Sequence, residues 1–565
     1  MEPVYYRKNK NLIFPFLEEN LGLENPQNYI PIYDTLFSLN ENNKNTINLN
    51  NKWELSNIHN KMQDRRCQCT VSDINNNTKK VEVFFKFAPL MDPVKYLIGK
   101  YNDCNIETLP LNDTTCNEKL LDVNNSAYID NYFSYLSSRL LHEYGFVHGI
   151  DYYGGFLAIK ENYIFNSEDD IDYVHKSSFF KKSKDHLFTI SDDLNEMINN
   201  DSTKNKTKLK INDNNSELIE LGSIIDIDTL DNLKEVNPNE IVGESNLLTL
   251  EEINKNHKST KSSSTCSSRS SVTDGEDDDD DDDDDSDEDD TDDEGNDESY
   301  NILIKKFPVN VIALEACNTT FDELIENDLS YAEIISAFMQ IIMTLIGYQK
   351  AFNLTHNDLH TNNIMYVPTE KQYLYYCFEN KYYKVPTYNR IYKIIDFGRA
   401  IYKYNGNLHC SDSFSMNGDA ATQYNCEPYL NDKKPRLEPN YSFDLCRLAC
   451  SLYDNLVDDD DDKEQNKGKQ NKGKQNKNNN ELYNPVKQII KKWCTDDKGR
   501  NILYKKNGDE RYPEFKLYKM IARTVHNLIP KTQLEDDIFK KYHVSKKSVK
   551  KNVKVVDIDS IPSMV

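Results

Sequence analysis

The sequence predicts an α+β fold in which a β-rich part comes first and a mainly helical part follows. Strand-like runs of β-branched and aromatic residues occur at 81–87 and 156–159. Apolar residues at helical spacing predict helices over 127–144 and roughly 331–352, and Gly145 is a suitable end for the first helix. Strands and helices in separate runs are typical of α+β proteins.

Two polar stretches interrupt this pattern. Residues 161–300 are rich in Asn, Lys, Asp and Ser, and they include an acidic tract, 274–298, with 20 acidic residues in 25 positions. Residues 458–480 begin with a run of Asp and continue as two copies of Gln-Asn-Lys-Gly-Lys. Such segments bury too little apolar surface to offset the loss of chain entropy. We therefore expect a largely disordered acidic insertion at 161–300, a low-complexity insert at 458–480, and one elaborated domain of about 400 residues.

The net charge of the chain follows mainly from the acidic tract. The 68 basic and 94 acidic residues give a formal charge of −26, and the tract contributes 20 of the negative charges. The rest of the chain is only mildly acidic, which argues against a basic nucleic-acid-binding surface. Cys67 and Cys69 have no matching second pair, so a zinc site is not expected.

The sequence also predicts an intracellular protein without a membrane partner. No apolar leader follows Met1, and the longest apolar helical stretch, 335–346, includes Gln340 and Thr344 and is too short to cross a bilayer. The twelve cysteines are scattered, which is typical of a reducing compartment.

Polar residues that suit phosphoryl transfer follow two of the predicted elements. The segment His-Asn-Asp-Leu-His-Thr-Asn-Asn comes directly after the long helix and contains Asp358 and Asn363, and an apolar strand later in the chain ends at Asp396. Phosphoryl transfer needs a carboxylate near the acceptor hydroxyl and oxygen ligands for Mg²⁺, commonly one Asp and one Asn. Asp358 can serve as the first, and Asn363 and Asp396 can serve as the metal ligands.

These two segments resemble the protein-kinase family. H-x-D-L-x-x-x-N followed by D-F-G is the signature of that family. The run VPTYNRIYKIIDFGRA at 385–400, after a Tyr-rich hairpin predicted near 369–390, is similar to serine/threonine kinases of giant nucleocytoplasmic large DNA viruses of the mimivirus kind. The resemblance implies a two-lobed fold, with a small β-rich N-lobe and a larger helical C-lobe. It also implies ATP and Mg²⁺ as cofactors, Ser/Thr hydroxyls of proteins as acceptors, and a place in the host cytoplasm or the virion.

The resemblance assigns roles to further residues. Lys86, a cation on an apolar strand, would hold the α- and β-phosphates, and Asp130 on the following helix would be its partner. The alternatives are an edge-strand lysine that faces water and an acid that favours a helix N-terminus. Glu315 and Cys317 would lie in the hinge at the adenine, and the buried Asp444 would brace the catalytic loop.

The implied boundaries divide the chain into seven parts. They are an extension at 1–50, the first part of the N-lobe at 51–160, the insertion at 161–300, an N-lobe strand and hinge at 301–320, the C-lobe at 321–540, its insert at 458–480, and a tail at 541–565.

Several departures from the family pattern leave two other functions open. No G-x-G-x-x-G occurs near 54–70, although a loop that covers phosphates usually needs glycine. Asn357 stands where most kinases have Arg, His360 stands where Ser/Thr kinases have Lys, and no A-P-E follows the D-F-G. The alternatives are a catalytically weak kinase-like binding module and a small-molecule kinase.

Overall fold

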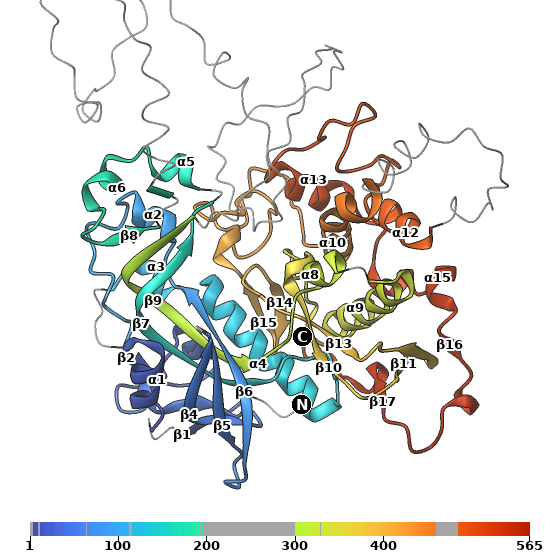
Figure 1. Ribbon diagram of the computed structural model, residues 1–565, viewed down its shortest axis with the longest axis horizontal. Helices are drawn as coiled ribbons and strands as arrows, with labels where there is room; N and C mark the ends of the chain where they lie inside the picture. Colours follow the sequence, from blue (N-terminus) through green and yellow to red (C-terminus); the bar gives the residue numbers. More distant parts are fainter. Residues whose placement is uncertain are drawn as a thin grey trace, which may run out of the picture. The chain divides into compact units, whose positions relative to one another are not determined.

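The computed structural model describes most of the chain in one compact unit (Figure 1). The described residues are 4–8, 12–63, 65–111, 116–168, 170–191, 194–195, 300–327, 329–458 and 484–565. The acidic tract, nearly all of the insert at 458–480 and most of the predicted insertion at 161–300 lie outside them.

A curled sheet of seven strands forms the first half of the fold (Figure 1). Its order is β2-β7-β9-β6-β5-β4, β8 also pairs with β9, and all neighbours are antiparallel. Alternation of buried and partly exposed residues along β5 and β6 gives the sheet one face in the core. The strands are β2 (Leu23–Gln27), β4 (Glu54–Gln63), β5 (Arg66–Ser72), β6 (Thr78–Pro89), β7 (Tyr152–Asn166), β8 (Phe188–Ile190) and β9 (Asn301–Glu315).

Helix α4 (Ser126–Tyr144) packs beside this sheet and confirms the helix predicted over 127–144. The Asn125 side chain caps its start by accepting a hydrogen bond from the amide of Ala127, and Gly145 ends it in the left-handed conformation (φ 64°). The Asn310 side chain of β9 donates to the carbonyl of Ala127, which ties the first turn of α4 to the sheet. This first turn is followed at once by Asp130.

Residues before position 51 are part of the same fold rather than a separate extension. Strand β2 pairs with β7, with Leu23 opposite Lys160, and helix α1 (Phe14–Leu21) precedes it. Strands β1 (Tyr6–Lys8) and β3 (Ile47–Leu49) form a small antiparallel pair.

Ordered structure also continues past position 160, where the sequence predicted the acidic insertion to begin. Strand β7 runs to Asn166, and α5 (Ile171–Val174), α6 (Ser178–Ser183) and β8 follow. Apolar pairing explains the difference, because the Tyr163 ring stacks on Phe307 with centroids 5.1 Å apart. Two short helices, α2 (Pro93–Leu97) and α3 (Glu118–Leu121), lie earlier in the chain.

The second half of the fold is built around helix α9 (Tyr331–Phe352), whose bounds agree with the predicted helix. Ser330 and Glu333 form a capping box at its start. Among the described residues, α9 is the one helix long and apolar enough to cross a membrane, yet 83% of that apolar window is buried, as expected of a core helix. The neighbouring helices are α8 (Phe321–Glu326), α10 (Phe443–Tyr453), α12 (Pro485–Trp493), α13 (Lys516–Thr524), α14 (Pro530–Gln533) and α15 (Asp537–Lys540).

Short strands complete the fold. The predicted Tyr-rich hairpin is confirmed as β11 (Tyr373–Phe378) and β12 (Lys381–Pro386), and the tail adds β16 (His543–Val544) and β17 (Val555–Asp557) to its two edges. The remaining pairs are β10 (Ile364–Pro368) with β13 (Arg390–Ile394), and β14 (Ile401–Tyr404) with β15 (Asn407–Cys410).

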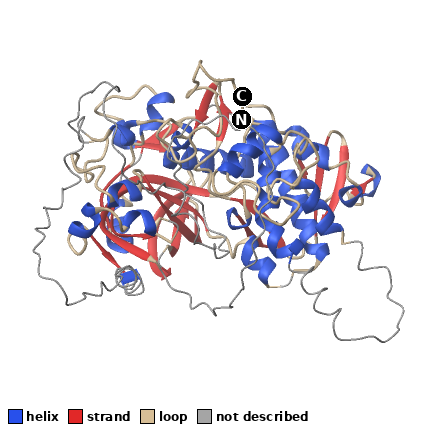
Figure 2. Ribbon diagram, turned by 90° about the horizontal axis from the view of Figure 1, so that it is seen from above, coloured by secondary structure: helices blue, strands red, loops and turns tan. Residues whose placement is uncertain are grey.

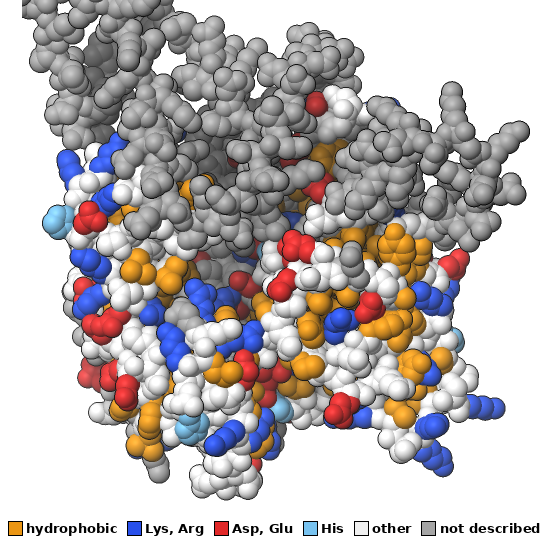
Figure 3. All heavy atoms as spheres, viewed as in Figure 1, with side chains coloured by type: hydrophobic (Ala, Val, Ile, Leu, Met, Phe, Trp, Pro, Cys, Tyr) orange, Lys and Arg blue, Asp and Glu red, His pale blue; other side chains and the backbone are white. Residues whose placement is uncertain are grey.

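The described chain is therefore a mixed α/β fold with a curled sheet and a group of helices. Figure 2 shows the long strands gathered to one side and most helices to the other. On the face drawn in Figure 3, basic, acidic and hydrophobic side chains are interspersed, in keeping with a chain that is only mildly acidic outside the tract.

Candidate active site

Lys86 on β6 lies between two carboxylates from different parts of the chain. Its Nζ is 2.7 Å from Asp130 Oδ2 on α4 and 2.8 Å from Asp396 Oδ1, two residues after β13. The second oxygen of Asp130 accepts a hydrogen bond from the amide of Phe397 at 2.9 Å. The structure thus brings three of the predicted residues together, and Asp130 holds both the lysine and the segment that carries Asp396.

The charges of these three groups determine their pKa values. Burial opposes the charge on Lys86, but the two carboxylates outweigh burial and raise its pKa. Burial also opposes ionisation of Asp396, yet Lys86 and the amide of Gly398 lower the pKa of this carboxyl to about 2. Burial and the charge of Asp396 raise the pKa of Asp130 despite Lys86. When both carboxyls are ionised, the group carries one surplus negative charge, and a cation would neutralise it.

Asp444, in the first turn of α10, binds the backbone of the segment that contains Asp358. The two carboxylate oxygens of Asp444 accept hydrogen bonds from the amides of His356 (3.0 Å) and Asn357 (2.9 Å), and Asp444 is fully buried. Asn357 adopts a left-handed conformation (φ 64°), and its side-chain oxygen accepts a hydrogen bond from the Tyr424 hydroxyl. Asp444 therefore fixes the backbone of the turn that presents Asp358.

Asp358 itself lies among cationic and hydroxyl groups. Its Oδ1 accepts a hydrogen bond from the Tyr518 hydroxyl at 2.9 Å and is 3.5 Å from the guanidinium of Arg399. Burial opposes ionisation of Asp358, but Arg399 and then the other nearby basic groups lower its pKa below the usual range. An ionised carboxylate at this place can orient a hydroxyl and accept its proton.

Asn363 is oriented by the same loop. Its side-chain nitrogen donates to the carbonyl of Asp358 at 2.9 Å and contacts His360 Nε2 at 3.0 Å. Burial lowers the pKa of His360 to about 4, so the imidazole is neutral at pH 7 and can accept this hydrogen bond. Both amide hydrogens of Asn363 are then used, which leaves its Oδ1 available to a cation.

The donor set fits Mg²⁺. The carbonyl of Asn363 accepts a hydrogen bond from the amide of Ile395 at 3.0 Å, so the loop and the strand that ends before Asp396 are joined at this point. The available groups are a carboxylate and an amide oxygen, which are the oxygen ligands that Mg²⁺ takes in proteins alongside water and phosphates.

The two predicted hinge residues have different surroundings. The Glu315 carboxylate forms an ion pair with Lys393 and accepts a hydrogen bond from the amide of Asp151 at 2.9 Å, so its side chain has a structural role. Cys317 is buried, and its carbonyl accepts a hydrogen bond from Arg66. Among the described residues nothing accepts a hydrogen bond from the amide of Cys317, which leaves this donor for a ligand.

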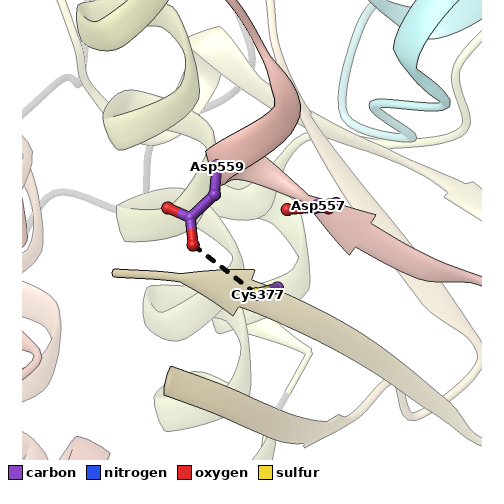
Figure 4. A group of neighbouring side chains, drawn as sticks. All are labelled: Cys377, Asp557 and Asp559. Carbon is purple, nitrogen blue, oxygen red and sulfur yellow. Dashed lines mark hydrogen bonds between the residues drawn. The ribbon is translucent and has the colours of Figure 1, made fainter. Parts of the chain in front are cut away.

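A second cluster of possible metal ligands joins strand β11 to the tail of the chain. Cys377, Asp557 and Asp559 bring their ligand atoms within 4.8 Å of one another (Figure 4). The Asp559 carboxylate accepts hydrogen bonds from the amides of Glu379 (2.8 Å) and Asn380 (2.9 Å) and also contacts the Cys377 thiol. These bonds close the β11–β12 turn against the tail, so the cluster has a structural explanation.

Sequence reasoning did not find three residues near Asp358, namely Arg399, Arg447 and Tyr518. Arg399 directly follows the D-F-G, and this adjacency was the available signal. Tyr518 comes from α13, 160 positions after Asp358, and no local pattern marks it.

No protein-family model and no curated protein matches this chain.

Proposed function

We propose that this protein is an ATP- and Mg²⁺-dependent protein kinase that transfers the γ-phosphoryl group to Ser or Thr hydroxyls of protein substrates. The observation that carries the proposal is the placement of Lys86 between Asp130 and Asp396. A lysine of the sheet, an acid of the adjacent helix and the Asp of a D-F-G are the groups that position nucleotide phosphates in kinases. The sheet and the helical group then correspond to the two lobes of the kinase fold, and a protein substrate inside the cell is the expected partner.

Each residue has a role that its contacts support. Asp358 orients the acceptor hydroxyl and takes its proton. Lys86, held by Asp130, would bind the α- and β-phosphates, and the amide of Cys317 would bind the adenine. Asn363 and Asp396 would hold Mg²⁺, which supplies neutralisation of phosphate charge when bound.

The test is transfer from γ-labelled ATP to proteins of a complex lysate. Asp358→Asn and Asp396→Asn should each lower labelling by about 10²-fold or more, since general-base and charge-stabilising groups contribute roughly this much. Asp537→Asn is a matched control, because its side chain is 99% exposed and far in sequence from the site. Full labelling by both variants would exclude the proposal.

The first alternative is a kinase-like binding module with weak catalysis. Strands β4 and β5 contain no glycine, and Arg66 of β5 donates to the carbonyls of Cys317 and Asn318. These two hydrogen bonds tie β5 to the segment proposed to bind the adenine. Titration calorimetry with Mg-ATP separates the two functions, because absence of binding up to millimolar nucleotide supports the module and excludes the kinase.

The second alternative is a small-molecule kinase. The Asp358 side chain is only 13% exposed and Tyr518 lies against it, which favours a small acceptor. Label that appears in the small-molecule fraction of the lysate and not in protein would support this function.

A further inference from the structure

Positive charge gathers on one side of Asp358. The Tyr518 ring lies between two guanidinium groups, with the Arg399 carbon 5.6 Å and the Arg447 carbon 5.0 Å from its centre. Arg399 also binds Asp419 at 2.6 Å, whereas within the described part of the chain the buried Nε of Arg447 has no hydrogen-bond partner. Arg399, 3.5 Å from Asp358, and Arg447, beside Tyr518, therefore place two guanidinium groups next to the proposed acceptor position.

The same helix carries more positive charge outward from Tyr518. Lys519 and Arg523 are one turn apart on α13, and the Arg523 guanidinium donates to the carbonyl of Thr422 at 3.2 Å. Thr422 follows Asp419 in the segment that starts at the D-F-G, so α13 and this segment border the same region.

These two cations lack counter-charges. Among the residues that the structure describes, no carboxylate forms an ion pair with either Lys519 or Arg523, whereas Arg399 has two carboxylate partners. Burial, and then the charges of Arg523 and Lys434, lower the pKa of the Lys519 ammonium. Positive charges that lie close together are stabilised when an anion binds beside them.

We propose that Lys519 and Arg523 form a basic surface that binds acidic side chains of the acceptor protein next to the phosphorylated hydroxyl. This inference rests on the proposed kinase function and adds the substrate class to it. Carboxylates beside the acceptor residue would pair with the cations, while the hydroxyl displaces that of Tyr518 from Asp358. Neutral or basic acceptors would leave the surface unpaired and would bind less tightly.

The chain itself contains a segment with the chemistry of such an acceptor. Ser286 and Thr291 lie within the acidic tract at 274–298, which is outside the described residues. A peptide with the sequence of 281–291, DDDDDSDEDDT, is therefore a suitable probe. Its control has Asn and Gln in place of Asp and Glu, so that only the charge differs.

Peptide binding tests the surface without requiring catalysis. Fluorescence polarisation would use the full chain and a full chain whose aspartates at 277–285 are replaced by Asn, because the native tract can compete for the surface. In the second chain, the acidic peptide should bind at least about fivefold more tightly than the control peptide, as two exposed ion pairs allow. Lys519→Ala with Arg523→Ala should remove this preference, and added salt should weaken it.

A matched double variant distinguishes binding at this basic surface from a general effect of the net charge of the protein. Lys550→Ala with Lys551→Ala removes two exposed lysines of the tail and should leave peptide binding unchanged. Equal binding of the two peptides, or equal weakening by both double variants, would overturn the inference.

The transfer assay distinguishes this inference from the kinase function. If the acidic peptide binds as expected but receives no phosphate, the kinase function fails and the binding surface stands. If phosphate is transferred equally well to both peptides, the kinase function stands and the inference fails.

Discussion

The charged groups at Lys86 and those at Asp358 differ in the sign of the charge that they leave uncompensated. Around Lys86, two carboxylates share one ammonium, which leaves negative charge. Around Asp358, the carboxylates of Asp358 and Asp419 balance Arg399 and Arg447, and α13 adds the positive charges of Lys519 and Arg523.

In the proposed kinase, this difference separates two tasks of the site. Surplus negative charge suits a divalent cation with its phosphates, whereas surplus positive charge suits an acidic acceptor. Asn363 connects the two groups, because its side chain donates to the carbonyl of Asp358 and its own carbonyl accepts a hydrogen bond from the amide of Ile395, next to Asp396. Changes on one side should therefore affect metal and nucleotide, and changes on the other should affect the acceptor.

Removal of the Lys86 cation should have the largest effect. Lys86→Ala leaves Asp130 buried and without its cation, and the free energy of unfolding should fall by about 3 kcal/mol. Lys381→Ala is a control, because the pair of Lys381 with Glu535 is exposed and its loss should cost less than about 1 kcal/mol. Urea denaturation of both variants measures the contrast. Equal losses of unfolding free energy in the two variants would show that the ion pair of Lys86 with Asp130 contributes no more than an exposed ion pair.

Removal of the Asp444 carboxylate, which binds the backbone next to Asp358, should have the next largest effect on stability. Asp444→Ala leaves the buried amides of His356 and Asn357 without acceptors, and the free energy of unfolding should fall by about 2–3 kcal/mol. Asp444→Asn keeps one acceptor oxygen and should lose about half as much. Denaturant titration with transfer assays should show parallel losses of stability and activity. An active, stable Asp444→Ala protein would contradict the bracing role.

The sequence allowed prediction of the candidate site where the chemistry is local. Asp358, Asn363 and Asp396 are recognisable because they lie in two short, continuous motifs that resemble those of protein kinases. Lys86 and Asp130 required the additional idea that a cation on an apolar strand needs an acid on the next helix. The structure places this pair 2.7 Å apart, although the register of the strands that brings them together could not be deduced from sequence.

Contacts between distant segments could not be predicted in the same way. The pairing of β2 with β7 depends on a match between Leu23 and Lys160, and no local pattern encodes it. Tyr518 meets Asp358 only because α13 packs against α10, and the residues of α13 show nothing more than an amphipathic helix. Composition also placed the start of the insertion too early, since polar residues after 160 alternate with apolar ones that pair with β9.

The pH dependence of stability should report on Asp396. Its pKa is lowered to about 2 in the fold, from about 3.8 in the unfolded chain, so its stabilising effect is complete above about pH 5 and is lost as the pH falls towards 2. Asp396→Asn should therefore be less stable than the wild type at pH 6, and the difference should shrink below pH 4. Thermal unfolding of both proteins between pH 6 and pH 2 measures this. A constant difference over that interval would contradict the ionised form of Asp396.

The smallest effect is expected from loss of the Tyr518 hydroxyl, which donates a hydrogen bond to Asp358. Burial raises the pKa of Tyr518 to about 12, so its hydroxyl keeps its proton and donates to the carboxylate. Tyr518→Phe removes one donor, so the pKa of Asp358 should rise, and the acidic limb of the pH–rate profile should move to higher pH. The free energy of unfolding should fall by about 1 kcal/mol.

Tyr424→Phe is the matched control for this last change. Its hydroxyl donates to the side chain of Asn357 rather than to a carboxylate, so its loss should reduce stability by a similar amount, about 1 kcal/mol. The pH–rate profile should stay where it is, because no titrating group loses a partner. A shift in both variants would mean that the profile reports the fold of the loop. A shift in Tyr518→Phe alone would mean that the acidic limb of the profile reports the ionisation of Asp358.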